Sequence, residues 1–91
     1  MIRINAFIKV DSANREAVLT AAKELVSASL REKGCIAYDI FESSTRNDVM
    51  MICETWTNEE DLHAHEKAEA FKTIVPKILE MASMKIEKLN F

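Results

Sequence analysis

Hydrophobic and polar residues alternate along the start of the chain. In residues 2–10, IRINAFIKV, every second side chain is apolar, which places one set on a single face: Ile2, Ile4, Ala6, Ile8 and Val10. This period of two is typical of a β-strand with one face in the core. Residues 35–42, CIAYDIFE, and 49–56, VMMICETW, predict an antiparallel hairpin joined by the polar loop SSTRND. Residues 84–91, MKIEKLNF, alternate again and predict a closing strand.

The apolar spacing between the first two strands is that of a helix. Asp11, Ser12 and Asn14 are candidate N-caps, and the helix that follows them is expected to run to about Lys33. Its core stripe recurs at intervals of three and four residues: Val18, Ala21, Ala22, Leu25 and Ala28. Gly34, the only glycine, follows at the point where a left-handed residue commonly ends a helix.

A second helix is predicted after the hairpin. Thr57 and Glu60 have the spacing of a capping box, so the helix is expected to begin at Asn58. An apolar stripe at helical spacing follows further along: Phe71, Ile74, Val75, Ile78, Leu79 and Ala82. Pro76 lies inside this stripe and has no amide hydrogen to donate, so we expect a kink or a break between two helical pieces there.

The order β-α-β-β-α-β predicts one ferredoxin-like α+β domain over residues 1–91, with both helices on one face of a four-stranded antiparallel sheet. The other face also carries apolar side chains, among them Phe7, Leu89 and Phe91. An apolar face that the helices leave open needs a partner, and a second copy of the chain related by a two-fold axis is the simplest one. We therefore expect a homodimer.

Composition and charge narrow the range of partners. The chain is 48% hydrophobic and 30% charged, which is the balance of a folded domain. Its net charge of -3, with Lys and Arg scattered singly, argues against a nucleic-acid partner. No apolar run approaches the ~18 residues of a membrane span, and the first residues lack a signal-peptide pattern, so we expect a cytoplasmic protein with no membrane partner. Cys35 and Cys53 lack metal-ligand spacing and are expected to be reduced, buried strand residues.

Several short motifs occur in a fixed order along the chain: Gly34-Cys35, Tyr38-Asp39, Glu54-x-Trp56, Leu62-x-Ala64-His65 and Phe71. In this order and spacing they resemble the antibiotic biosynthesis monooxygenase domain family, which includes quinol monooxygenase-like proteins. The resemblance covers nearly the whole chain. It implies a dimeric α/β barrel that oxygenates a quinol or polyphenol-like aromatic small molecule with O2. It also implies that the reaction uses no flavin, haem or metal, so no cofactor is expected.

The resemblance further implies roles for individual residues. His65 matches a histidine on the family's helix and is the expected base that deprotonates the substrate. Glu54 and Trp56 match positions in the third strand and are expected to act with His65 in catalysis. The expected substrate-binding residues are Tyr38, Phe71 and, as the polar group of the first strand, Asn5.

Two departures from the family pattern bear on the reaction. Family members usually have a second histidine soon after the first, directly before a phenylalanine, whereas Ala70 precedes Phe71 here. The haem-degrading relatives need an axial histidine further along the helix, where this chain has Val75 and Pro76. Haem degradation is therefore not expected.

The residues also allow other interpretations. His65 could be a surface histidine beside Glu66, and Glu54 could either hydrogen-bond to His65 or pair with a lysine or arginine. His63 lies about 200° around the helix from His65 and is expected to be solvated. The alternative function is a non-oxygenase isomerase, processing protein or binding protein on the same dimeric scaffold.

Overall fold

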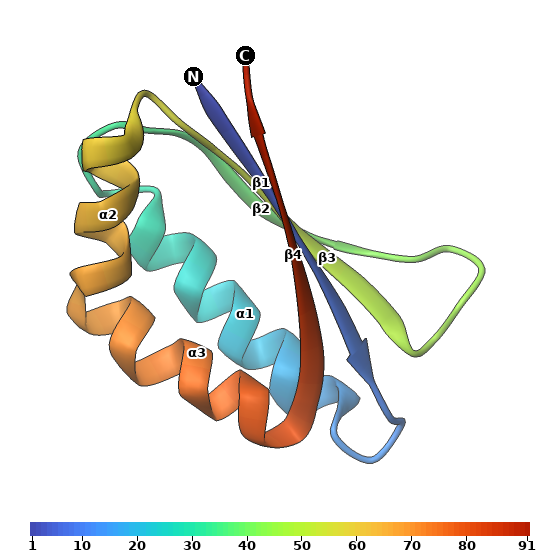
Figure 1. Cartoon of the computed structure of the whole chain (residues 1–91). Coiled ribbons are helices and arrows are strands. Elements are labelled where there is room, and N and C mark those ends of the chain that lie inside the picture. The colour runs from blue at the N-terminus through green and yellow to red at the C-terminus, as the bar shows by residue number, and fades with distance from the viewer.

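Four strands form one antiparallel sheet in the order β2-β3-β1-β4, and three helices cover one of its faces (Figure 1). The computed structural model describes residues 1–91. The elements in chain order are β1 (Ile2–Val10), α1 (Arg15–Ser29), β2 (Cys35–Glu42), β3 (Val49–Trp56), α2 (Glu59–Lys67), α3 (Glu69–Met81) and β4 (Ala82–Asn90). The predicted ferredoxin-like α+β fold is confirmed, with the helices on one face of the sheet.

Strand β1 lies in the middle of the sheet and sets which side chains face the helices. Ile4 is paired with Glu54 on β3, and Glu54 is paired in turn with Tyr38 on β2. Directly paired side chains point to the same face of a sheet. All three are buried. The register thus places Ile4, Glu54 and Tyr38 in one row beneath the helices.

The hydrophobic core lies between the helix-covered face of the sheet and helices α1 and α3. Its 17 buried residues include five from α1: Val18, Leu19, Ala21, Ala22 and Leu25. Four of these five belong to the predicted stripe, and Leu19 is the fifth. Ala28, the last residue of the predicted stripe, is only half-buried. Helix α3 adds Ile74 and Ile78. Burial of these faces supplies the main stabilisation of the helices, because helices this short are marginal alone in water.

Helix α1 ends at Ser29, four residues before the predicted end at Lys33. The amide N–H of Arg31 donates to Ala28 and that of Glu32 to Ser29, so the chain leaves the helix through tight i→i+3 turns. Gly34 has the predicted left-handed backbone, with φ at 81°, but it turns the chain into β2 and does not end the helix itself.

The cap of α2 differs by one residue from the predicted capping box. Asn58, not Thr57, is the N-cap, and its side-chain oxygen accepts a hydrogen bond from the backbone N–H of Asp61 at 2.9 Å. The hydroxyl of Thr57 donates instead to the carbonyl oxygen of Gly34 at 3.2 Å. Thr57 therefore ties the start of α2 to the turn before β2.

The break between two helical pieces lies at Ala68, not at Pro76 as predicted. Ala68 has an extended backbone and is both the C-cap of α2 and the N-cap of α3, while α3 continues through Pro76 to Met81. The buried face of α2, which contains His65, would reach polar Glu69 and Lys72 if the helix continued. The extended backbone at Ala68 changes the direction in which the side chains of α3 point relative to those of α2. The apolar stripe of α3 therefore also faces the core.

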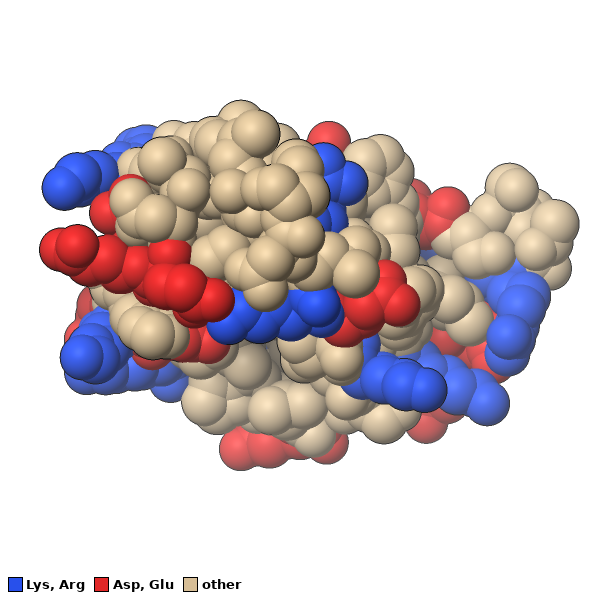
Figure 2. All heavy atoms as spheres, turned by 45° about the horizontal axis from the view of Figure 1, so that its top comes forward, with Lys and Arg blue, Asp and Glu red and all other residues tan.

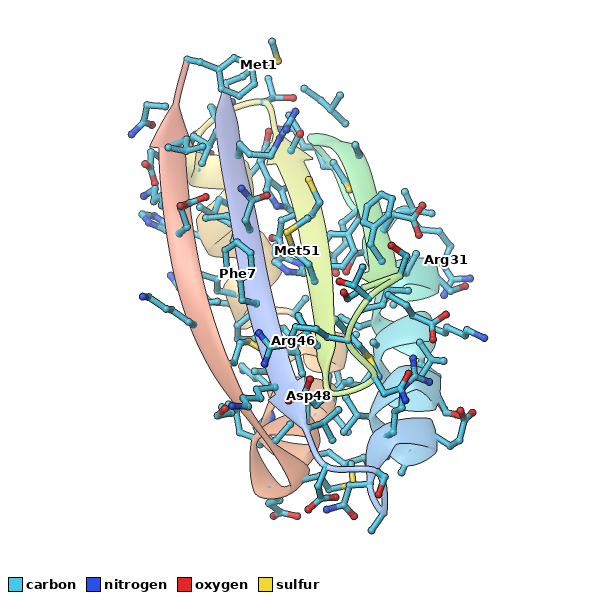
Figure 3. The ribbon with its side chains drawn as sticks, turned by 90° about the vertical axis from the view of Figure 1, so that its right-hand side faces the viewer. Met1, Phe7, Arg31, Arg46, Asp48 and Met51 are labelled. Carbon is cyan, nitrogen blue, oxygen red and sulfur yellow. The ribbon has the colours of Figure 1, made fainter.

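The opposite face of the sheet carries no helix. Figure 3 shows Phe7 and Met51 side by side on this face, and the strand register adds Phe41 beside Met51. Phe7 and Phe41 are 41% and 50% exposed, so an apolar row lies open to water. Cys35 and Cys53 are free and lie in strands, as predicted, but they are half-buried and not buried.

Charged side chains are spread around the molecule. On the face drawn in Figure 2, basic and acidic side chains lie interspersed, without a continuous basic area. None of the three helices is both long and apolar enough to cross a membrane.

Candidate active site

A cavity of about 270 Å³ lies beneath α2 and α3 on the helix-covered face of the sheet. Eleven of its fourteen lining residues are apolar or aromatic: Ile4, Ala6, Leu25, Tyr38, Ile52, Leu62, Phe71, Val75, Leu79, Met84 and Ile86. The three others are Glu54, His65 and Glu66. An apolar cavity with a few converging polar groups is the usual form of a small-molecule site.

His65 is buried in the middle of an aromatic group. Its side chain is only 1% exposed. The centroid of its ring lies 4.5 Å from that of Trp56, 5.2 Å from that of Phe71 and 5.4 Å from that of Tyr38. The interpretation of His65 as a surface histidine is therefore wrong. Contacts with three rings hold the imidazole in one orientation.

The two ring nitrogens of His65 meet two different carboxylates. Nδ1 lies 2.6 Å from Oε1 of Glu32, which is a hydrogen bond. Nε2 lies 3.8 Å from Oε1 of Glu54 and has no hydrogen-bond partner, although it is buried. The hydrogen bond between Glu54 and His65, one of the two alternatives for Glu54, is thus not formed, and Glu32 is the residue that bonds to the ring.

Glu32 was not among the residues that the sequence indicated. It lies in the turn after α1 and is 33 residues from His65 in the chain. No spacing rule connects a turn residue with a residue of a distant helix, so only the folded chain brings them together. The one local clue is that Glu32 precedes the conspicuous Gly34 by two residues.

Glu54 is bound to its own strand neighbour. The indole Nε1–H of Trp56 donates to Oε1 of Glu54 at 2.8 Å. His65 is the only basic side chain within ion-pair distance of Glu54, so the alternative in which Glu54 pairs with a lysine or arginine is wrong. Burial raises the pKa of Glu54 above its usual value, while the hydrogen bond from Trp56 and the neighbouring His65 partly oppose that rise.

Tyr38 lies opposite Glu54 on the neighbouring strand and lines the same cavity. Burial, followed by the charge of Glu54, raises the pKa of its phenol far above the usual value. Tyr38 therefore stays neutral over the physiological range and keeps a hydroxyl that can donate a hydrogen bond.

The structure brings together four of the six predicted site residues at the cavity wall: His65, Glu54, Tyr38 and Phe71. Trp56 is fully buried behind His65 and does not line the cavity. Asn5 lies on the open face of the sheet, where its Nδ2 donates to Oε1 of Glu87 at 2.9 Å. Asn5 is therefore separated from the cavity by the sheet, because it lies between inward-facing Ile4 and Ala6.

The second histidine is not part of the site. The side chain of His63 is 60% exposed, and its Nε2 lies 3.5 Å from Oε2 of Glu59 one turn earlier in α2. The expectation of a solvated His63 is confirmed. The structure also contains no group of three His, Cys, Asp or Glu side chains that could hold a metal ion.

Comparison with known proteins connects this geometry to a family. The family model described as antibiotic biosynthesis monooxygenase matches residues 1–77. The Bacillus subtilis protein named "Putative monooxygenase YcnE" is 32% identical over 87 residues, which cover 96% of this chain and 92% of that protein.

Solved structures share the fold. A Bacteroides thetaiotaomicron protein of unknown function, described as a possible oxidoreductase, superposes with a TM-score of 0.98 at 59% identity and covers 99% of this chain and 96% of its own. SnoaB, a cofactor-independent oxygenase from Streptomyces nogalater, has a TM-score of 0.89 at 8% identity, over 99% of this chain and 91% of its own, and so shares the fold alone. Since the family model covers most of the sequence, this chain belongs to the antibiotic biosynthesis monooxygenase family.

Proposed function

We propose that the chain is a monooxygenase that oxidises a quinol or polyphenol-like aromatic small molecule with O2 and without a cofactor. Membership of the family and the relative named as a monooxygenase support a monooxygenase-like function in general. The observation that carries the finer proposal is the free Nε2 of His65. It is buried, lacks a hydrogen-bond partner and belongs to a ring that lines an apolar cavity.

A phenol bound with its hydroxyl at Nε2 would satisfy this nitrogen and lose its proton to it. The phenolate then gives an electron to O2 far more readily than the neutral phenol does. A histidine suits this step because its unperturbed pKa is near neutral pH. For a quinol the overall reaction forms a hydroxyquinone and water. One oxygen atom of O2 bonds to a ring carbon, the other leaves as water, and the substrate supplies all four electrons.

The other cavity residues have roles in binding. Phe71 offers the face or edge of its ring to a flat substrate, and Tyr38 offers a neutral hydroxyl to a second substrate oxygen. Glu54 holds the indole of Trp56 with its Oε1, and Trp56 packs against the ring of His65. We propose that Glu54 and Trp56 keep the base in place, and Asn5 is not included because the sheet separates it from the cavity.

The volume of the cavity limits the substrate. At about 270 Å³ it is slightly smaller than the ~300–1,000 Å³ of typical ligand pockets. It is less than twice the ~150 Å³ of an apolar cavity that holds one benzene molecule. A substrate of one or two rings therefore fits better than a larger polycyclic one.

We also propose that the chain forms a homodimer through the open face of the sheet. The exposed row of Phe7, Met51 and Phe41 supports this, because a row of this kind gains the most from burial against a matching copy. Leu89 and Phe91, at the end of the chain, are also exposed. The family is one whose members commonly form dimers.

The test is oxygen uptake by metal-stripped protein supplied with reduced one-ring and two-ring quinols, measured against buffer and quinol alone. The variant is His65→Ala, and the matched control is His63→Ala, which removes a solvated histidine from the same helix. We expect saturable uptake in the wild type and in His63→Ala. The loss of a general base lowers kcat of His65→Ala by about 10²–10⁴-fold.

Each other outcome changes the conclusion. Equal uptake by His65→Ala and the wild type removes the proposed base but keeps an oxygenase. No uptake above the quinol control for any substrate overturns the oxygenase and favours the isomerase, processing or binding protein.

A further inference from the structure

His65 lines two hollows of different character. One is the apolar cavity described above. The other has a volume of about 290 Å³ and is lined mostly by charged residues. Besides His65, its lining consists of Glu32, Lys33, Glu60, Asp61, Ala64 and Ala68. The imidazole of His65 therefore borders both an apolar hollow and a charged one.

The hydrogen bond of the ring identifies its protonated nitrogen. A neutral imidazole carries one N–H, and the nitrogen that donates to a carboxylate is the one that carries it. Nδ1 lies 2.6 Å from Glu32, whereas Nε2 at 3.8 Å from Glu54 is beyond hydrogen-bond distance. The geometry favours the proton on Nδ1 and a lone pair on Nε2.

The surroundings of the two carboxylates favour the same assignment. The side chain of Glu32 is 22% exposed and borders the polar hollow, so water can solvate its charge. The side chain of Glu54 is only 7% exposed, and burial raises its pKa. An ionised carboxylate accepts a stronger hydrogen bond than a neutral one. Glu32 is thus the better partner for the ring proton.

We propose that Glu32 is a positioning residue that holds His65 in the tautomer with the proton on Nδ1, so that the bare Nε2 is left beside Glu54, a residue of the apolar cavity wall. Glu32 also stabilises the imidazolium that forms when Nε2 takes a proton from a bound phenol, because its carboxylate lies beside the ring. The significance of this arrangement for turnover rests on the proposed function, but the tautomer itself is a property of the protein alone.

Long-range ¹H–¹⁵N NMR tests the tautomer directly, in the absence of any substrate. The spectrum of uniformly ¹⁵N-labelled protein is recorded at a pH where the imidazoles are neutral, and His63, which is solvated, serves as the internal reference for exchanging tautomers. We expect the nitrogen shifts of His65 to show a proton on Nδ1 and none on Nε2.

Three variants separate the role of Glu32 from a general effect of charge. In Glu32→Ala the ring loses its acceptor. In Glu32→Gln, which keeps the size of the side chain, the amide can either accept from Nδ1–H or donate to a bare Nδ1. Both variants are expected to shift His65 toward a mixture of tautomers. Glu60→Ala removes a carboxylate from the same hollow, and its His65 shifts are expected to stay as in the wild type.

Two results would overturn the proposal. One is a wild-type His65 with the proton on Nε2, and the other is a His65 tautomer that does not change in either Glu32 variant. Oxygen uptake is a separate readout, in which Glu32→Gln is expected to lower kcat by about tenfold or more with little change in KM. If the wild type consumes no oxygen, the proposed function fails while the NMR result still decides the tautomer.

Discussion

The indole Nε1–H of Trp56 donates a 2.8 Å hydrogen bond to Oε1 of Glu54, two residues earlier on the same face of β3. Both side chains are buried, so neither water nor a lysine replaces this bond. The bond satisfies a carboxylate oxygen that lies 3.8 Å from Nε2 of His65. Trp56 thus supports the site from behind, without lining the cavity.

Removal of the indole donor is expected to destabilise the protein. Trp56→Phe keeps a ring in the core but leaves Oε1 of Glu54 buried without its partner, so the free energy of unfolding falls by about 1–3 kcal/mol. Urea denaturation measures this change. In the double variant Trp56→Phe with Glu54→Leu no unpaired oxygen remains, and the loss is expected to be smaller than the sum of the two single losses. Additive losses would contradict the prediction.

Glu54 is expected to make stability depend on pH. Since burial raises the pKa of Glu54 in the folded state, its carboxyl binds a proton more tightly in the folded than in the unfolded chain. Proton binding by Glu54 therefore stabilises the folded state below pH 4.5, the ordinary pKa of a glutamate. This stabilisation is lost as the pH rises through the raised pKa of Glu54 in the folded state.

Glu54→Gln removes this titration. We expect the variant to become more stable relative to the wild type as the pH rises from 4.5 upward, in urea unfolding at a series of pH values. Glu80→Gln, on the exposed side of α3, is the control and should show no such trend. Parallel curves for the wild type and Glu54→Gln would show that the burial of Glu54 has no such effect.

Gly34→Ala is expected to destabilise the turn before β2 for two reasons. An L-residue at φ 81° costs about 1–2 kcal/mol, and the added Cβ would meet the side chain of Asp61 on α2. The free energy of unfolding should therefore fall by more than the backbone cost alone. In an Asp61→Gly background, which also removes the Cβ of residue 61, the steric part disappears, and only about 1–2 kcal/mol should remain. A loss of the same size in both backgrounds would exclude the contact with Asp61.

The thiol of Cys35 is expected to react slowly. Burial, with added repulsion from Glu54 and Glu32, raises its pKa from 9.0 to about 11. Because the thiolate is the reactive form, alkylation of the folded protein at pH 8 should be roughly a hundredfold slower than that of an ordinary thiol. The rate is measured with iodoacetamide in a Cys53→Ser variant, and it should rise tenfold per pH unit until about pH 11. A plateau near pH 9, or equal rates in folded and urea-unfolded protein at pH 8, would contradict the raised value.

A charge on the open face of the sheet is expected to dissociate the proposed dimer. Met51→Glu places a carboxylate in the middle of the Phe7–Met51–Phe41 row, where dimer formation would bury it between two phenylalanines. Light scattering after size-exclusion chromatography should give the mass of two chains for the wild type and of one for the variant. Leu30→Glu changes an exposed apolar residue after α1, away from the sheet, and should keep the mass of the wild type. A wild type with the mass of one chain would overturn the dimer.

The sequence predicted the secondary structure closely wherever a local pattern carried the information. The bounds of β1, β2 and β3 are the predicted ones, because the alternation of side chains along a strand depends only on adjacent residues. The helix break was misplaced for a physical reason. The lack of an amide hydrogen in Pro76 is visible in the sequence, whereas the change of phase at Ala68 becomes apparent only when both helices must face one core.

For the site too, some features follow from local sequence patterns and others only from tertiary packing. The resemblance carried by the order of the motifs indicated Glu54, Trp56, Tyr38 and His65, and alternation along β3 placed Glu54 and Trp56 on one face. The structure places the four side chains around one another. The same alternation already assigned Asn5 to the other face of β1, against the role that the resemblance implied. Local periodicity therefore determined which side chains face the helices.

Only the tertiary structure decided which groups touch. The bond between Glu32 and His65 joins a turn to a helix 33 residues later, and the packing of α2 on the sheet leaves Nε2 of His65 3.8 Å from Oε1 of Glu54, beyond hydrogen-bond distance. Such contacts depend on how α1, α2 and the sheet pack together. Periodicity along a chain sets the direction of each side chain, but the distance between two side chains from different elements is set by the packing of the whole core.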